Sequence, residues 1–544
     1  MKIFWSLLFL AVSLLGCSKK KQADLIVYNA KVYTVNNNFD TVEAFAVKQG
    51  RILALGKTDE ILSNYKAADK IDAGGKPVYP GFIDAHAHFF EYGQHLQMAD
   101  LRDTKSWQEV IDRLKTFAKT HSEGWLIGNG WDQNDWDNKD FPTNDKLNDA
   151  FPNRPVFLSR VDGHAAIANQ TALALAGLKI PKKISGGDMQ AINGKLTGVL
   201  IDNAVGLVAQ KIPIPDAVSA EKIFLDAQKN CFSVGLTTVD DCGLDYQYVE
   251  FIEKLQKEKK LKMRLFVMLS DKKTNYDYLF RRGPIKTNLL NVSSFKVYAD
   301  GALGSRGACL LQPYTDKPNE TGFLLSSQKH FEEIAKRLAK SSFQMCTHAI
   351  GDSANRVILK IYNKVLKGKN DRRWRIEHAQ VIDPQDFILF AKANIIPSVQ
   401  PTHATSDMYW AGERLGENRI KNAYAYKQLL NQNGWMPLGT DFPVEDISPI
   451  KTFYAATVRK DAKGFPPAGF QIENAITRIE ALKGMTIWAA KANFEEKEKG
   501  SLEVGKFADF VMLDQDLLRT NQSTLLKTNV LKTYLNGEKV YEAK

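Results

Sequence analysis

The stretch Tyr79-Pro-Gly-Phe-Ile-Asp-Ala-His-Ala-His88 is the most informative part of this chain, because an apolar run ends in two histidines one residue apart. Alternate residues of a β-strand project to the same side. His86 and His88 therefore face the same way, and two such imidazoles can bind one metal ion. An isolated His-x-His pair is equally compatible with two polar residues in a loop, so the interpretation depends on partners elsewhere in the chain.

Four later runs end in the same manner. Each is short, apolar and rich in β-branched or aromatic residues, and each carries at or near its end a side chain that can approach a metal: Lys296 in residues 294–301, His348 in 344–348, His378 in 374–378 and Asp441 in 436–441. Four neutral imidazoles and one carboxylate suit Zn²⁺ or a similar divalent transition metal, whereas Mg²⁺ and Ca²⁺ prefer oxygen ligands. The sequence therefore predicts a metal site built from distant segments.

The middle of the chain alternates strand-like runs with helical stretches, which predicts parallel strands joined by crossover helices. Eight such runs occur, over residues 78–84, 236–241, 262–269, 294–299, 343–348, 374–378, 395–400 and 436–441. Eight is the number that closes a (β/α)₈ TIM-type barrel, in which side chains at the C-terminal strand ends form the active site. The candidate ligands fall at the ends of strands one, four, five, six and eight.

The two chain ends differ from the middle in their sequence pattern. Residues 24–75 and 500–544 contain short β segments broken by asparagine and glycine, a pattern typical of hairpins. We expect both ends to build one composite β-sandwich, which leaves residues 76–499 for the α/β barrel. The interval from about residue 90 to 230, after barrel strand one, is too long for an ordinary βα loop. We expect an inserted subdomain there.

The first residues resemble a bacterial lipoprotein signal peptide. Lys2 precedes an apolar run over residues 3–15 that is too short to span a bilayer, and Leu14-Leu-Gly-Cys17 resembles a lipobox. The resemblance implies removal of residues 1–16, lipidation of Cys17 and a polar tether over 17–23; the alternative is an ordinary secretory peptide. We expect a protein of the bacterial cell envelope, lipid-anchored to the membrane and facing the periplasm or the outside.

Length and charge narrow the function classes. With 544 residues and 44% hydrophobic content, the chain can bury a large core and exceeds the size of most single domains. The 73 basic and 62 acidic residues give a net charge of +11, but the basic residues are scattered rather than gathered in a stripe. We therefore expect no nucleic-acid partner. Apart from Cys17, the four cysteines show no paired spacing, and we expect mostly free thiols.

The ordered set of histidines, lysine and aspartate closely resembles the amidohydrolase superfamily. The phrases at residues 80–88, 299–306 and 439–443 look like its N-substituted formamide deformylase-like (exoenzyme regulatory protein-like) branch, and the resemblance covers roughly residues 24–544. It implies the same composite sandwich, one or two divalent ions, and a carbamate (N6-carboxylysine) on Lys296 that bridges a pair of ions; homodimers fit the family as well. A charged Lys296 would be repelled by such ions. The alternative is a lysine that points elsewhere or pairs with Asp300, which leaves one ion.

The expected activity is metal-dependent hydrolysis of a non-peptide C–N bond in a small-molecule amide, N-substituted formamide or cyclic amide. A bound ion lowers the pKa of water and polarises a carbonyl group, and Asp441 is the predicted general base. The alternatives are hydrolysis of an ester, a lactone or a carbamate at the same site, or a lipid-anchored solute-binding protein.

Further residues are candidates for roles around the site. The resemblance places His164 near a pocket, where it would polarise the substrate carbonyl or stabilise an oxyanion, and Arg306 and His403 are predicted to contact substrate. Asp84 and Glu377 are candidates to orient ligand imidazoles. Glu377 is the weaker partner for His378, because adjacent strand residues face opposite sides.

Overall fold

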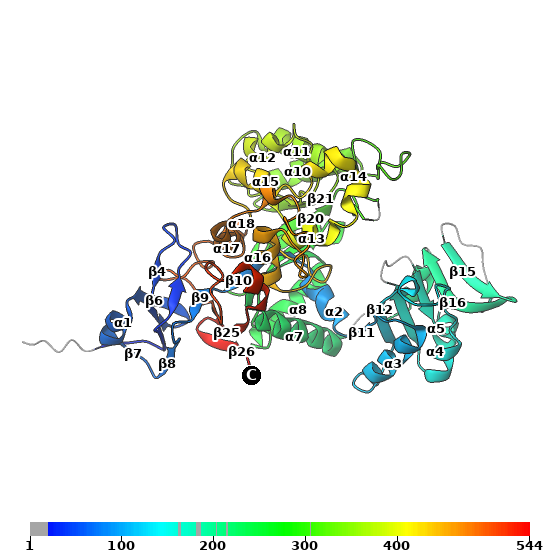
Figure 1. Ribbon diagram of the computed structural model, residues 1–544, viewed down its shortest axis with the longest axis horizontal. Helices are drawn as coiled ribbons and strands as arrows, with labels where there is room; N and C mark the ends of the chain where they lie inside the picture. Colours follow the sequence, from blue (N-terminus) through cyan, green and yellow to red (C-terminus); the bar gives the residue numbers. More distant parts are fainter. Residues whose placement is uncertain (1–19, 161–164, 181–186, 203, 214–215, 305) are drawn as a thin grey trace, which may run out of the picture.

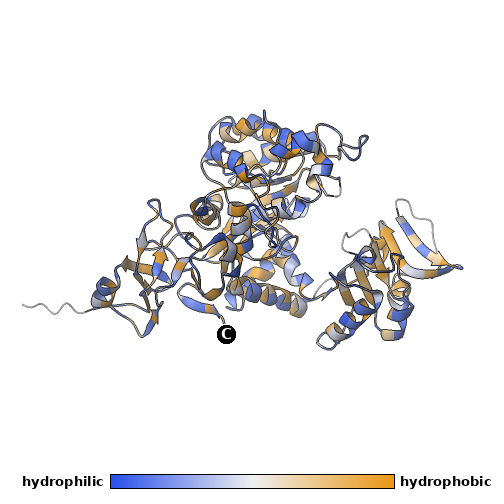
Figure 2. Cartoon of the chain, in the orientation of Figure 1, coloured by the Kyte–Doolittle hydropathy of each residue, from blue (hydrophilic) through white to orange (hydrophobic). Residues whose placement is uncertain are grey.

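The computed structural model describes residues 20–160, 165–180, 187–202, 204–213, 216–304 and 306–544. A barrel occupies the centre, with a β-sandwich from the two chain ends on one side and the inserted subdomain on the other (Figure 1). Apolar residues gather in the sheets of all three parts, and the outer surfaces of the helices are mainly hydrophilic (Figure 2). The mixed α/β barrel architecture predicted from the sequence is therefore confirmed.

Seven parallel strands form a nearly closed barrel, and their spatial order follows the order of the chain. They are β10 (Phe82–Ala87), β17 (Leu236–Leu244), β18 (Arg264–Ser270), β20 (Leu290–Tyr298), β21 (Gln344–Ala349), β22 (Arg375–His378) and β23 (Ile396–Ser398). A short antiparallel strand, β19 (Ile285–Lys286), pairs with β20. Strands such as β18 are buried along nearly their whole length, as expected for parallel strands that are covered on both faces.

The eighth predicted strand, over residues 436–441, does not form as a regular strand. An extended segment takes its place and bonds to both neighbours. On the β23 side the N–H of Gly439 donates to the carbonyl of Val399 over 3.0 Å, and on the β10 side the N–H of Asp441 donates to the carbonyl of His86 over 2.7 Å. The prediction of eight regular strands is wrong at this position, yet the segment bridges the gap between the first and seventh strands.

Local chemistry explains why this segment is irregular. Pro437 has no N–H to donate to a ladder. A side chain at Gly439 would lie 2.5 Å from the backbone nitrogen of His86, so only glycine permits this close approach. Buried Asp84 then holds the segment from β10, because it accepts bonds from the N–H and the hydroxyl of Thr440 over 3.0 and 2.7 Å. Asp84 thus anchors the segment that carries Asp441.

Helices cover the outside of the barrel. They are α2 (Phe89–His95), α7 (Ala217–Ser233), α8 (Tyr246–Lys257), α9 (Lys273–Arg282), α10 (Gln328–Ala339), α11 (Asp352–Leu366), α12 (Phe387–Lys392), α13 (Pro401–Asp407), α14 (Ala411–Arg419), α15 (Tyr426–Asn433), α16 (Pro449–Val458), α17 (Arg478–Gly484) and α18 (Ile487–Ala492). At the start of α17, Thr477 and Glu480 form a capping box. Within the described residues, no helix has the length and apolar character needed to cross a membrane.

The sandwich draws its two sheets from both ends of the chain. The four-stranded sheet has the order β6 (Arg51–Gly56), β5 (Ala44–Lys48), β2 (Leu25–Tyr28) and β8 (Asp69–Asp72). The six-stranded sheet has the order β26 (Glu538–Glu542), β25 (Val530–Leu535), β24 (Phe510–Leu513), β9 (Pro77–Pro80), β3 (Lys31–Tyr33) and β4 (Thr41–Val42). The rings of Phe45 and Phe510, one from each end, meet edge-on at 5.1 Å between centroids. The predicted composite sandwich is present.

The predicted first barrel strand, residues 78–84, is split between two sheets. β9 pairs with β24 and β3 in the sandwich, and β10 then enters the barrel. Gly81 separates them, and a side chain there would collide with Thr237 at 2.3 Å. The sandwich therefore extends to Pro80, beyond the expected boundary at residue 75, and it is joined to the barrel directly at the strand that carries the two histidines.

The insertion has its own six-stranded sheet and core. The sheet order is β11 (Ala99–Asp100), β12 (Leu126–Trp131), β13 (Val156–Arg160), β14 (Ala165–Ala168), β16 (Lys195–Asp202) and β15 (Gly187–Ile192). Its helices are α3 (Trp107–Ala118), α4 (Asp145–Ala150), α5 (Gln170–Leu175) and α6 (Val205–Ala209). The inserted subdomain spans fewer residues than the expected range of about 90–230. Helices α2 and α7, near the two ends of that range, pack against each other and against β17, so they belong to the barrel.

Candidate metal centre

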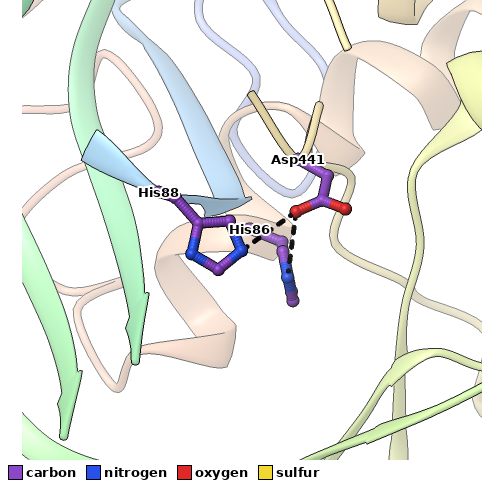
Figure 3. Close-up of side chains that lie close together, drawn as sticks. All are labelled: His86, His88 and Asp441. Carbon is purple, nitrogen blue, oxygen red and sulfur yellow. Dashed lines mark ion pairs between the residues drawn. The ribbon is translucent and has the colours of Figure 1, made fainter. Parts of the chain in front are cut away.

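The C-terminal ends of the barrel strands bring together all six predicted metal-site residues. His86 lies on β10, Lys296 on β20, His348 on β21 and His378 at the end of β22, while His88 and Asp441 follow β10 and the eighth segment. The Nε2 atom of His86 lies 3.1 Å from Lys296 Nζ. Asp441 Oδ1 lies 3.3 Å from His88 Nε2 and 3.5 Å from His86 Nε2 (Figure 3). The ring of His378 lies 4.7 Å from that of His86 and 4.5 Å from that of His348.

Two of these side chains are placed by unusual backbone conformations. His378 has a φ of 72° and Asp441 a φ of 66°, in the left-handed region that non-glycine residues rarely occupy. Such strain is commonly stored at functional sites. At the end of β22 the left-handed turn also lets two consecutive residues, Glu377 and His378, both face the barrel interior, which a regular strand would forbid.

Hydrogen bonds to the outer ring nitrogens orient two of the imidazoles. The Nδ1 atom of His86 lies 2.6 Å from Glu377 Oε2, and that of His378 lies 2.7 Å from Gln400 Oε1. A carboxylate or an amide oxygen can only accept, so each Nδ1 donates its hydrogen and leaves the Nε2 lone pair free for a metal. Glu377 therefore orients the ring of His86, on the other side of the barrel, and not that of its sequence neighbour His378.

His403 lies between two carboxylates beside the cluster. Its Nε2 is 3.2 Å from Asp441 Oδ2 and its Nδ1 is 3.1 Å from Glu445 Oε1. Burial works against a charged imidazole, but these two hydrogen bonds raise the pKa of His403 well above its usual range. Asp441 therefore has one oxygen held by His403 and the other directed at the His86/His88 pair. The Asp441 carboxylate belongs to two groups of side chains that could hold a metal ion. One contains His86 and His88, and the other contains His378 and His403.

At His88 burial is outweighed by the Asp441 carboxylate, which raises the pKa above the ordinary value, whereas at the other three candidate ligand imidazoles burial decides the protonation state. Burial lowers the pKa of His86 and of His378 well below the ordinary value, and that of His348 to about 3, so these imidazoles are neutral at physiological pH. Burial would raise the pKa of Asp441, but the hydrogen bond from His403 and the close approach of the His88 imidazole outweigh burial and hold the pKa well below the usual range. Neutral imidazoles and a carboxylate are the donor set expected for Zn²⁺.

Two candidate ligand residues at the centre each have a buried polar atom with no hydrogen-bond partner among the described residues. The two atoms are Asp441 Oδ1 and His348 Nε2. An unsatisfied buried polar atom costs roughly 1–3 kcal/mol, and usually signals a missing partner. The orphaned carboxylate oxygen lies within 3.5 Å of two histidine Nε2 atoms, so the residues fit a bound divalent metal ion.

The remaining predicted site residues lie elsewhere or outside the description. Arg306 is tied to Asp316 by an ion pair of 2.7 Å on the loop after β20, where Arg414 also pairs with Asp316. Asp300, the alternative partner for Lys296, instead accepts the N–H groups of residues 309, 350 and 351. His164 and Cys17 lie outside the described residues.

Sequence reasoning missed two residues that contact the cluster. Gln400 stands at the end of predicted strand seven, so its position was visible, but nothing in the residue type indicated a partner for His378. Glu445 follows Asp441 in a loop and carries no sequence signal. Both act only through contacts made in the folded chain.

A parallel barrel whose strand ends gather imidazoles, a lysine and a carboxylate around orphaned buried atoms defines the class of metal-dependent hydrolases. A family model described as the amidohydrolase family matches residues 69–541. The chain belongs to the amidohydrolase family, and it is a hydrolase of carbon–nitrogen bonds other than peptide bonds.

Named relatives match over nearly the whole chain. LONG AFTER FAR-RED 3 of Arabidopsis thaliana is 31% identical, and the match covers 95% of this chain and 92% of the relative. N-substituted formamide deformylase of Arthrobacter pascens is 26% identical, with 95% and 98% covered. A solved structure of an uncharacterized metal-dependent hydrolase from Pyrococcus furiosus superposes with a TM-score of 0.77 at 28% identity, and covers 91% of this chain and 100% of that one.

Proposed function

We propose that the protein hydrolyses the C–N bond of a small amide, an N-substituted formamide or a cyclic amide, with Asp441 as the general base. The observation that carries the proposal is the Asp441 carboxylate, which is ionised and buried. Its one unpartnered oxygen faces His86 on β10 and His88 just after that strand. The similarity to a relative named N-substituted formamide deformylase supports formamides as one of the proposed substrate classes.

The residues that would hold the metal are His86, His88, His348, His378 and Asp441, and a carbamate on Lys296 would add two further oxygens. Zn²⁺ or a similar divalent transition metal bound there would supply an activated water at neutral pH and polarise the substrate carbonyl. The chain's own contribution is positional: Glu377 and Gln400 fix two ring orientations, and Asp84 fixes the segment that presents Asp441.

Asp441 is proposed to move one proton during the reaction. As the water oxygen bonds to the carbonyl carbon, Asp441 accepts the water proton, and it returns that proton to the nitrogen as the C–N bond breaks. The products are a carboxylic acid, or formate, and an amine. His403 holds the other carboxylate oxygen over 3.2 Å, so the base keeps one orientation through the transfer.

Lys296 is proposed to carry a carbamate. Its Nζ is fully buried and lies 3.1 Å from His86 Nε2, where an ammonium would oppose a bound cation. Neighbouring groups outweigh burial and raise the pKa of Lys296, so the ammonium must first lose one proton. The neutral amine then forms a C–N bond with CO₂ and releases a second proton, and a positive group is replaced by a negative one with two oxygens. A carbamate in this place can bridge two ions.

Metal content and turnover together test the proposed function. We expect elemental analysis of protein expressed from residue 18 onward, purified without chelator, to give about two equivalents of a transition metal per chain, as in two-ion hydrolases. We expect the same protein to hydrolyse N-formyl or N-acyl amines, and a chelator to abolish the turnover. A metal content of about one equivalent per chain would exclude a carbamate that bridges two ions. No metal after reconstitution would overturn hydrolysis by this site.

A lipid anchor at Cys17 is a separate proposal, supported by the resemblance of residues 14–17 to a lipobox. We expect the full-length protein to sediment with membranes of the cell envelope and to incorporate a labelled fatty acid. Cys17→Ser should abolish the label and release the protein from the membrane fraction, because acyl chains supply the affinity. Cys231→Ser, a buried cysteine in α7, is the control. Label retained in Cys17→Ser would disprove the anchor.

A further inference from the structure

A cavity of about 380 Å³ adjoins the candidate metal centre on the side of β10 and β17. His88 lines it, and so does Gly243 at the end of β17. A side chain at Gly243 would lie 3.1 Å from Tyr298 Oη and 3.9 Å from Lys296 Cγ. The cavity therefore borders the cluster at two points, His88 and the neighbourhood of Lys296.

The orphaned atom at the metal centre marks which end of the cavity is reactive. Asp441 is only 6% exposed, and its unpartnered Oδ1 lies 3.3 Å from Nε2 of His88, the residue that the cavity shares with the cluster. A carbonyl group held at this carboxylate would leave the rest of the molecule to extend past His88 into the cavity. The space is large enough for a short substituent on one side of the scissile bond.

The charged groups that line the cavity are acidic, with Glu91, Asp241 and Asp245 as its carboxylates and no lysine or arginine among its lining residues. Two of the three are already occupied. Asp241 accepts the N–H groups of Phe89 and Phe90 at the start of α2. Asp245 pairs with Lys272 over 2.8 Å and accepts a bond from Asn275.

Glu91 is the carboxylate that remains uncommitted. It makes no hydrogen bond among the described residues, and its contacts with His88 Nδ1 and His95 Nε2 are both long, at 3.9 Å. Its side chain is 55% exposed, so it can reorient toward a bound group. A cation placed there would gain a charge-assisted hydrogen bond, while a carboxylate would meet like charge at Glu91, where the only bases that line the cavity are the imidazoles of His88 and His95.

We propose that this cavity receives the amine side of the substrate and selects a group with a second, positively charged amino group, recognised by Glu91. The inference rests on the proposed function and narrows its substrate class to acylated diamines or related cationic amides. The C–N bond is cleaved at the Asp441 end, and the charged amine stays at the Glu91 end until the product leaves.

Three formamides matched in length test the selectivity: monoformyl diaminobutane, formylpentylamine and formylaminopentanoate, which differ only in a positive, neutral or negative end. On the metal-loaded full-length protein we expect kcat/KM to fall in that order, with the cation favoured about fivefold over the neutral compound at low salt, a ratio typical of a partly exposed ion pair. Glu91→Gln should bring the ratio of cation to neutral close to one. Glu250→Gln, an exposed position on α8, is the matched control and should keep the ratio.

Calorimetric binding of the amine products separates this inference from the proposed function. We expect diaminobutane to bind more tightly than pentylamine, and Glu91→Gln to remove the difference. Absence of turnover on all three formamides would remove N-substituted formamides from the proposed substrates, while Glu91-dependent diamine binding would still uphold the subsite. Equal turnover of cation and neutral compound, equal binding of the two amines, or a preference that persists in Glu91→Gln would overturn the subsite.

Discussion

Asp441→Asn is expected to lower kcat about 10³-fold, within the range by which a positioned general base accelerates proton transfer, while the protein keeps its metal. Asparagine retains an oxygen that can face the ion, but its NH₂ group cannot accept the hydrogen that His403 donates to Oδ2, and the amide cannot accept the water proton. Steady-state kinetics on an N-formyl amine and elemental analysis on the same preparation measure the two effects separately.

The control for this variant is Asp446→Asn. Asp446 is an aspartate five residues later that is half exposed and pairs with Lys451. It should leave both kcat and metal content within about twofold of the wild type, as surface substitutions usually do. An unchanged kcat in Asp441→Asn would remove Asp441 from the general-base role. Loss of metal with loss of turnover would assign it to metal binding instead.

Lys296→Ala is expected to lower metal occupancy from about two equivalents to one or fewer, with a loss of turnover of two or more orders of magnitude, comparable to the loss of a catalytic group. The side chain is fully buried beside His86, so its removal leaves a space where a bridging group had been. Formate, acetate or propionate at millimolar concentration should enter that space and restore part of the occupancy, because a free carboxylate offers the same two oxygens as a carbamate.

Lys254→Ala provides the comparison, because Lys254 is an exposed lysine on α8 whose contacts are weak, a long ion pair to Glu258 and a distant approach to the Phe251 ring. It should keep full metal content and show no response to added acids. Thermal melting of both variants checks that Lys296→Ala remains folded. Full occupancy in Lys296→Ala would exclude the bridging role, and turnover would then have to be explained with Lys296 as a non-ligand.

Much of the barrel could be predicted because parallel strands buried on both faces are continuous apolar runs. Seven of the eight predicted runs became barrel strands, shifted by a few residues at their ends. The failure at residues 436–441 has a local cause, since Pro437 interrupts the ladder and Gly439 is needed for close contact with His86. The split of the first run between β9 and β10 could not be read, because both halves are equally apolar and only Gly81 marks the change of sheet.

The residue types of the candidate site could be predicted from the sequence, but the hydrogen bonds between them could not. His86, His88, Lys296, His348 and His378 stand where strands end, and strand ends can be located from neighbouring residues alone. The partner of Glu377 could not be predicted, because His86 lies 291 residues away in the chain and on the other side of the barrel. The inward direction of Glu377 also depends on the left-handed backbone of His378, which breaks the alternation on which the expectation rested.

The sequence by itself determined seven of the barrel strands, their order and the candidate metal ligands near their ends, since these depend on local periodicity and on residue chemistry. Only the tertiary structure decided which ring nitrogens are held by Glu377 and Gln400, that His403 supports Asp441, and that Glu91 is left uncommitted beside an open cavity. These relations arise when barrel closure brings together groups hundreds of residues apart, and no local pattern in the chain specifies such distances.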